Sequence, residues 1–110
     1  MTNKITQKVY DSIREAVVTV PGVISFVEFN KDENSVEVVK TTDTYKAIEV
    51  AYTDGMYRIR IHVMLIVGVN IPDVLIEIQV RVKYELERQS GFSENYLVDV
   101  VIDKLESLSV

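Results

Sequence analysis

His62 is the only histidine of the chain, so it is the first candidate for a catalytic base or a metal ligand. It follows Arg58 and Arg60 at two-residue spacing, which places the three side chains on one face of an extended strand. General-base catalysis and zinc binding both need partner side chains, and the chain offers no second histidine and no cysteine. The simplest interpretation of His62 is a half-exposed strand residue. We therefore predict no catalytic residue and no metal site, and a small hydrolase centred on His62 is a third hypothesis.

The same residues, Arg58, Arg60 and His62, form the alternative site, a small basic face for nucleic acid with Tyr57 beside it. Single-stranded nucleic acid is usually bound by several stacking rings in a basic groove. The chain has 12 Lys and Arg residues against 17 Asp and Glu residues, and its net charge of −5 repels phosphate backbones and anionic lipid headgroups. A nucleic-acid-binding module is therefore the alternative function, and nucleic acid is not the expected partner.

Glycine and acidic residues complete the search for binding motifs. Gly55, Gly68 and Gly91 each stand alone at a turn or a helix end, so no glycine-rich phosphate loop is present. The segment from Asp32 to Ser35 lacks the later glycine and glutamate of a calcium loop. We predict no cofactor.

The composition is that of an ordinary globular protein, with 110 residues of which 47% are hydrophobic and 26% are charged. This length predicts a single domain, residues 1–110. The N-terminal segment has no signal-peptide pattern, and the most apolar stretch, 59–71, is shorter than the ~20 residues that a spanning helix needs. The absence of cysteine fits a reducing compartment. We expect a cytoplasmic protein that reaches a membrane only through a partner.

The elements that would position these side chains are organised around the segment from Tyr57 to Ile66, which reads YRIRIHVMLI. Every second residue is apolar, which predicts a long central strand with one face in the core. The expected core residues of this strand are Tyr57, Ile59, Ile61, Val63 and Leu65. Asp54-Gly55 comes just before and predicts a tight hairpin with another strand at 47–52.

The N-terminal part predicts a helix followed by a strand. Apolar residues recur every three to four positions from Ile5 to Val20, with Thr2 or Asn3 as the N-cap and Pro21 as the stop. Residues 23–29 then predict a short strand. Residues 30–44 are polar and predict a mobile surface excursion at about 30–45 that contains at most one weak edge strand.

Residues 70–90 fit either a strand or a helix periodicity. A helix is favoured because Asn70 is a good N-cap, Pro72 lies in the first turn and Gly91 follows the segment. Residues 96–102 then alternate as a last strand, parallel to the central one, and Lys104 to Val110 form a short tail. The predicted fold class is α+β: two helices packed on one face of a small mixed β-sheet, in the order α-β-β-β-α-β.

The helix pattern leaves Ile76, Val80 and Tyr84 at four-residue spacing beside the stripe that is expected in the core. Two interpretations stay open at this point. The three residues belong to a broad buried stripe, or they form an exposed ridge that contacts a partner or a second copy of the chain. They are the candidate interaction surface.

Short motifs are spread along nearly the whole chain, from Ile5 to Ile102. They are Val20-Pro21-Gly22-Val23 after the helix that contains Ala16, the hairpin at Asp54-Gly55, Ile71-Pro72-Asp73-Val74 at a helix start, Gln79 and Val82 within that helix, Gly91 behind it, and the alternation of Tyr96 to Ile102. In this order and spacing they resemble the alkaline shock protein family, the bacterial envelope stress response proteins. Val67 departs from the family pattern, which has an aromatic residue before the glycine, and residues 30–44 match no family pattern.

The resemblance implies a non-enzymatic cytoplasmic protein of cell-envelope homeostasis under stress. Some members of the family self-associate, and some lie at the membrane through a separate membrane-anchored partner. By resemblance we therefore expect an interaction or scaffold module with a protein partner, with self-association into an oligomer and with no direct membrane insertion.

Overall fold

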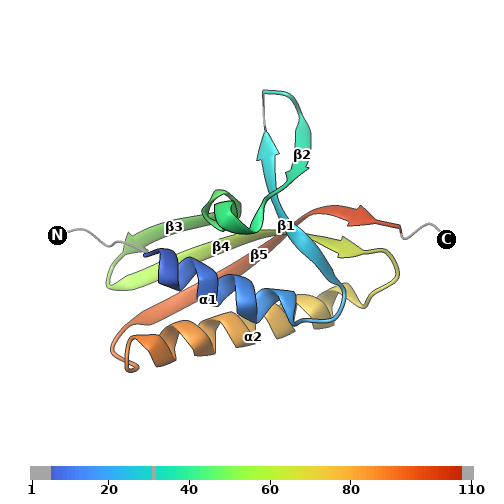
Figure 1. Cartoon of the computed structure of the whole chain (residues 1–110). Helices are drawn as coiled ribbons and strands as arrows, with labels where there is room; N and C mark the ends of the chain where they lie inside the picture. The colour runs from blue at the N-terminus through green and yellow to red at the C-terminus, as the bar shows by residue number, and fades with distance from the viewer. Residues whose placement is uncertain (1–5, 31, 108–110) are drawn as a thin grey trace.

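The computed structural model describes residues 6–30 and 32–107, which form one sheet with helices over one of its faces (Figure 1). The elements in chain order are α1 (Gln7–Val18), β1 (Val23–Asn30), β2 (Ser35–Val38), the 3₁₀ helix η1 (Thr41–Ala47), β3 (Ile48–Thr53), β4 (Met56–Ile66), α2 (Ile71–Gln89) and β5 (Asn95–Glu106). The predicted α+β class is confirmed.

β4 is the centre of the five-stranded sheet, as its alternating pattern predicts. β5 runs parallel to β4 along its whole length, from Met56 opposite Asn95 to Ile66 opposite Glu106. Because β5 fills one edge of β4, the two antiparallel neighbours share the other edge, β3 along residues 56–61 and β1 along residues 63–65. The sheet is therefore mixed, and β4 pairs with β1, β3 and β5.

The β3–β4 hairpin has the two-residue turn that Asp54-Gly55 predicts, with Thr53 opposite Met56. Both turn residues have positive φ, 54° at Asp54 and 76° at Gly55. A type I′ turn requires this, and its twist matches the twist of the two strands. The predicted hairpin is confirmed.

The helix α2 begins as its sequence predicts. The Asn70 side chain accepts a 3.1 Å hydrogen bond from the backbone N–H of Asp73, and Pro72 lies in the first turn. The capping oxygen satisfies one of the backbone donors that every helix start leaves unpaired. The helix connects β4 to the parallel strand β5, so both the helical assignment and the parallel pairing are confirmed.

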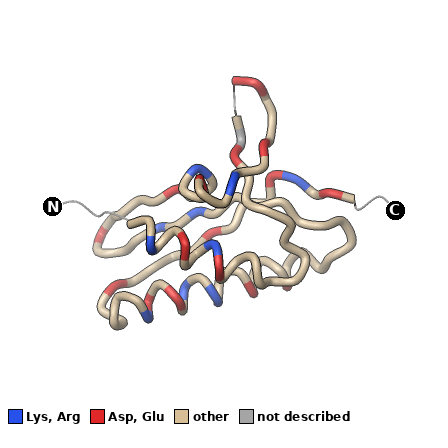
Figure 2. Tube along the Cα trace, viewed as in Figure 1, with Lys and Arg blue, Asp and Glu red and all other residues tan. Residues whose placement is uncertain are grey.

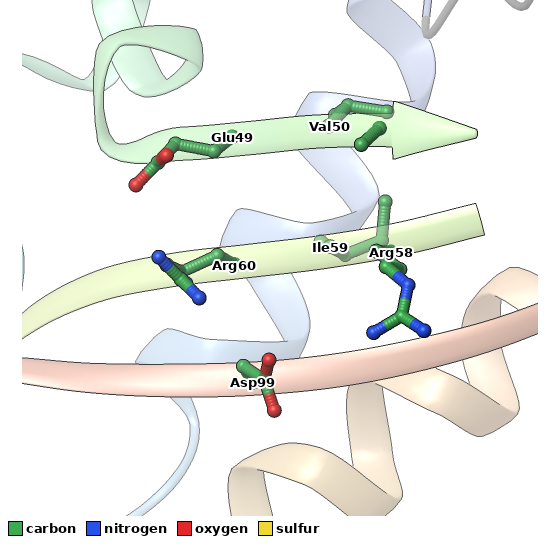
Figure 3. Close-up of a pocket in the computed structure, with 7 residues that line it drawn as sticks. Glu49, Val50, Arg58, Ile59, Arg60 and Asp99 are labelled. Carbon is green, nitrogen blue, oxygen red and sulfur yellow. The ribbon is translucent and has the colours of Figure 1, made fainter. Parts of the chain in front are cut away.

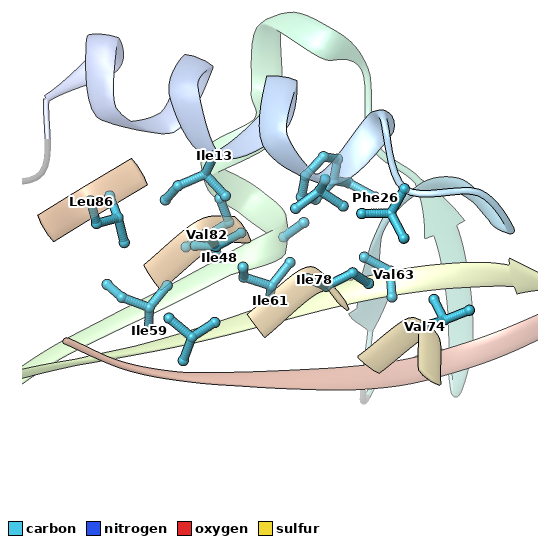
Figure 4. Packing of buried hydrophobic residues seen from close by; sticks show 14 of the residues in the cluster. Ile13, Phe26, Ile48, Ile59, Ile61, Val63, Val74, Ile78, Val82 and Leu86 are labelled. Carbon is cyan, nitrogen blue, oxygen red and sulfur yellow. The ribbon is translucent and has the colours of Figure 1, made fainter. Parts of the chain in front are cut away.

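The core lies between the sheet and the two α-helices (Figure 4). β4 presents every second side chain to the core, as the alternation of side chains along a strand requires. Each α-helix contributes one apolar stripe, whose residues recur with the period of the helix. The buried residues of these elements are Ile59, Ile61, Val63 and Leu65 on β4, Ile13 and Val17 on α1, and Val74, Ile78, Val82 and Leu86 on α2. The cover is wider than two helices, because η1 adds Ala47 to the same core.

The predicted element order is wrong within residues 30–45, which hold two ordered elements. β2 pairs antiparallel with β1 and is the weak edge strand that the pattern allowed, while η1 follows it (Figure 1). In η1 the Thr44 side chain is buried, and its hydroxyl donates a 2.9 Å hydrogen bond to the Thr41 carbonyl. A polar side chain that is satisfied within its own helix can be buried at little cost, so a polar sequence here folds onto the core.

Two predicted boundaries also differ. β5 continues to Glu106, because β4 extends to Ile66 and offers it backbone partners up to that point, so the first three residues of the expected tail, 104–106, belong to a strand. α1 begins at Gln7, and the expected caps Thr2 and Asn3 lie outside the described residues.

Gly22 turns the chain from α1 into β1 with a φ of +98°, a conformation that residues with a Cβ rarely adopt. A Cβ at this position would lie 2.8 Å from Cγ1 of Val69. Gly22→Ala should therefore lower the free energy of unfolding by about 1–3 kcal/mol in a urea titration. Gly68→Ala is the control, because φ is +100° there and a Cβ meets nothing within 4 Å. If Gly22→Ala and Gly68→Ala lower the free energy of unfolding equally, the contact with Val69 adds nothing to the loss at Gly22.

Candidate interaction surfaces

The helix α2 has three faces with different surroundings. One face is buried against the sheet and consists of Val74, Ile78, Val82 and Leu86. A second face contacts α1, where the Arg81 guanidinium donates a 2.8 Å hydrogen bond to the Thr19 hydroxyl. The third face is exposed and carries the candidate interaction surface, so the interpretation of one broad buried stripe is wrong.

Ile76, Val80 and Tyr84 lie on this third face and are 57%, 60% and 58% exposed. Phe92, which follows the helix, is 64% exposed and extends the row, because its ring lies 6.2 Å from that of Tyr84 in an edge-to-face arrangement. We call Ile76, Val80, Tyr84 and Phe92 the α2 ridge. The sequence does not predict Phe92 as a member, because its position depends on the turn after Gly91.

The backbone at Phe92 is strained. Its φ is +61°, and its backbone N–H donates a 2.7 Å hydrogen bond to the Glu87 carbonyl. A residue other than glycine in this conformation costs about 1–3 kcal/mol, and such strain gathers at functional sites. The cost is not offset by burial of the ring, which is exposed. This combination supports a contact role for the aromatic end of the ridge.

Two ion pairs lie within α2, on the side of the ridge that faces α1. Arg81 Nε donates a 2.6 Å hydrogen bond to Glu77 Oε2, and the Arg88 guanidinium contacts the Glu85 carboxylate. The hydrogen bond from Arg88 lowers the pKa of Glu85, with a smaller contribution from Gln89. A partner would therefore meet an apolar row with charged side chains beside it, which is the common arrangement of an apolar interface core and a polar rim.

Arg58, Arg60 and His62 share the sheet face opposite the core, as their spacing predicts. The strand register places Arg60 between Glu49 on β3 and Asp99 on β5. A hollow of about 260 Å³ is lined here by the charged residues Glu49, Arg58, Arg60 and Asp99. Figure 3 shows these side chains on β3, β4 and β5.

The imidazole of His62 lies between two carboxylates. Its Nδ1 is 2.8 Å from Oδ2 of Asp103, and its Nε2 is 2.5 Å from Oε2 of Glu49. In a catalytic triad one ring nitrogen faces a carboxylate while the other faces the nucleophile. Here each ring nitrogen lies within hydrogen-bond distance of a carboxylate oxygen, so neither nitrogen is free to take a proton from a nucleophile.

This sheet face mixes charges instead of forming a basic patch. Its two arginines are interleaved with the carboxylates of Glu49, Asp99 and Asp103. Figure 2 shows acidic and basic residues interspersed along the helices and the sheet as well. Binding of a phosphate backbone depends on a local excess of positive charge. The acidic neighbours therefore weaken the nucleic-acid interpretation of Arg58, Arg60 and His62.

Three tyrosines form a row across one end of the sheet, and no sequence motif predicts this row. The register places Tyr57 of β4 opposite Tyr52 of β3 on one side and opposite Tyr96 of β5 on the other. The ring centroids are 4.7 Å apart in the first pair and 5.2 Å apart in the second. We call Tyr52, Tyr57 and Tyr96 the tyrosine row. Burial raises the pKa of Tyr57, and the negative charge of Glu94 raises it further.

The raised pKa of Tyr57 makes stability depend on pH at the alkaline end. The folded protein holds the phenolic proton of Tyr57 more tightly than the unfolded chain does. The resulting contribution of Tyr57 to the free energy of unfolding is therefore fully present below about pH 10. It is lost as the pH rises through the folded-state pKa. We expect Tyr57→Phe to lose less stability than the wild type on going from pH 8 to above about pH 11, measured by urea midpoints. The same decline in both proteins would assign the alkaline loss to other groups.

Within residues 6–30 and 32–107, no set of three or more His, Cys, Asp and Glu side chains is arranged to hold a metal ion. The helices of this part of the chain are too short or too polar to cross a membrane. Comparisons with protein-family profiles, with curated proteins and with solved structures found no significant match to the chain. Membership of the alkaline shock protein family therefore stays a prediction from the sequence motifs.

Proposed function

We propose that this protein is a non-enzymatic interaction or scaffold module in cell-envelope homeostasis under stress. It acts at the cytoplasmic side of the membrane through a protein partner and associates with further copies of itself. The single observation that carries the interaction role is the α2 ridge, a row of four exposed apolar side chains, three on α2 and one just behind it, on the side of the helix that faces away from the core. The envelope role rests on the resemblance of the sequence motifs to the alkaline shock protein family.

The α2 ridge has the composition of a binding surface. Contiguous exposed apolar side chains are uncommon on monomeric proteins and mark sites that another molecule covers. Tyr84 and Phe92 supply aromatic rings at one end, and aromatic residues are enriched among those that dominate binding energy. Val80 lies in the middle of the helical part of the row. Four-residue spacing along a helix forms a ridge that fits the groove of a second helix, from a partner or from another copy.

The other surfaces support a role without catalysis. Both ring nitrogens of His62 face carboxylates, and the described residues that line the hollow beside Arg60 include no hydroxyl side chain that could act as a nucleophile. A membrane location would depend on a partner that carries the anchor, with this chain contributing the ridge.

Affinity capture from the native cells tests the proposal, with the membrane and soluble fractions analysed separately. The tagged wild type is expected to retain untagged copies of itself and a membrane-anchored protein, and the tagged Val80→Glu variant is expected to lose both. Unchanged recovery with Val80→Glu would refute the ridge as the contact surface. Recovery of RNA or ribosomal components alone, from the soluble fraction, would favour the alternative function.

That alternative is a small nucleic-acid-binding module that uses Arg58, Arg60 and His62. It is favoured by one observation: the two arginines are exposed, and neither forms an ion pair among the described residues. Filter binding of single-stranded RNA at two salt concentrations tests it, because contacts with phosphates weaken steeply as salt rises. Binding that is absent at low salt removes the alternative.

A further inference from the structure

The tyrosine row offers stacked rings at the surface, on a part of the molecule that the α2 ridge does not include. Tyr57 and Tyr96 are half-buried at the margin of the core, where they stack with an interplanar angle of 16°. Tyr52 packs against Tyr57 at 63° and is 41% exposed. The two half-buried rings, Tyr57 and Tyr96, therefore hold the exposed ring of Tyr52 in place. A ligand can bind the Tyr52 ring without first having to order that side chain.

Acidic residues surround this row. Asp54 lies in the turn between Tyr52 and Tyr57, and Glu94 lies two residues before Tyr96. Glu87 of α2 also belongs to this acidic margin, because its charge contributes to the raised pKa of Tyr96. In the described part of the chain, Asp54, Glu87 and Glu94 form no ion pair. The charge of Glu94 acts on both inner rings, because it contributes to the raised pKa of Tyr57 and of Tyr96, where burial is the first cause. The row and its margin thus carry negative charge from carboxylates that form no ion pair within the described chain.

We propose that the tyrosine row binds an arginine side chain in an extended basic segment of a partner protein. The face of an aromatic ring is negative, so it attracts a cation placed within about 6 Å of its centre. A guanidinium is planar and weakly hydrated, which lets it stack on the ring of Tyr52 while its N–H groups donate to carboxylates at the margin. This site goes beyond the proposed function, since the α2 ridge is apolar and takes a different kind of surface.

A nucleobase is the other ligand that stacks well on tyrosine rings. Its phosphates would lie near Asp54, Glu87 and Glu94, whose charges repel them. A basic peptide meets the same carboxylates as attractive partners. Charge therefore selects the arginine-bearing peptide, and an oligonucleotide serves as the competing probe.

Titration of the purified protein with a blocked hexa-arginine peptide tests the proposal, with two-dimensional NMR as the readout of affinity and location. The largest shifts are expected at the tyrosine row and Glu94. Tyr52→Leu is expected to raise the dissociation constant about fivefold, the size of an exposed cation–π contact. Tyr45→Leu is the matched control, because Tyr45 is also exposed but contacts Tyr10 instead of the row. It should bind as the wild type does.

A second pair of variants separates specific binding from general attraction to an acidic protein. Glu94→Gln and Glu37→Gln remove the same charge from two exposed or half-exposed positions, and only Glu94 lies beside the row. We expect Glu94→Gln to weaken binding more than Glu37→Gln does. Equal effects of these two variants, an unchanged affinity of Tyr52→Leu, or tighter binding of an oligouridine than of hexa-arginine would each overturn the proposal.

Discussion

Replacing Ile78 with alanine is expected to lower the free energy of unfolding by about 2–5 kcal/mol, the range for removing a fully buried large aliphatic side chain. Ile78 is 0% exposed and belongs to the main core, together with residues of α1 and β4. The substitution leaves a cavity between two helices and a sheet, which relax only partly. Because domains of this size are stable by about 5–15 kcal/mol in total, the loss is a large share of the whole.

Ile76→Ala is the matched control, because it removes the same atoms from the same helix two residues away. Ile76 is 57% exposed, so its truncation is expected to change the free energy of unfolding by less than about 0.5 kcal/mol. Urea unfolding followed by circular dichroism measures both variants. Comparable losses for the two would place the α2 ridge in the core and remove the basis of the proposed function.

This pair of residues also shows what the sequence can and cannot predict. In residues 71–89 a strand pattern would place Ile76 and Ile78 on the same face. In a helix, side chains two residues apart point to nearly opposite sides. The cap at Asn70, the proline at position 72 and Gly91 behind the segment together predict the helix. The sequence could not decide whether Ile76, Val80 and Tyr84 were covered, because that depends on which sides of α2 the sheet and α1 occupy.

The strands were predictable where local signals agree. β4 alternates along its whole length, and the Asp54-Gly55 turn fixes its pairing with β3. Residues 30–45 lacked such signals, because the elements there are short and polar. Thr44 can be buried because its hydroxyl donates a hydrogen bond within η1. A local hydrogen bond of this kind has no periodic sequence pattern from which it could be predicted.

The tyrosine row was half predictable. Tyr52 and Tyr57 are equally distant from the Asp54-Gly55 turn, so the predicted hairpin already makes them opposite neighbours. Adding Tyr96 needs the register of β5 against β4, which depends on the length of α2 and of the turn that follows it. Parallel pairing after a long connection has no turn to set it, so the third member could not be derived from the sequence.

Placing a carboxylate in the middle of the α2 ridge is expected to abolish its contacts while the fold persists. In the complex Val80→Glu would bury a charge without a partner, which costs about 3–5 kcal/mol. That corresponds to a loss of affinity of more than about 100-fold. In the free protein the side chain is 60% exposed, so the carboxylate stays in water and the helix keeps its core stripe. Sedimentation and affinity capture measure association, and circular dichroism measures the fold.

Two controls show whether the loss comes from the ridge itself. Lys83→Gln changes the net charge by the same amount on an exposed position of α2, and it should leave association intact. Val82→Glu places the same carboxylate two residues away in the buried stripe, and it should unfold the protein because Val82 is 0% exposed. If Val80→Glu behaves as Val82→Glu does, the ridge is packed in the native protein. If it behaves as Lys83→Gln does, the surface makes no contact. Only a folded Val80→Glu protein that fails to associate fits a binding surface, because that result requires a site that is open in the free chain and closed in the complex.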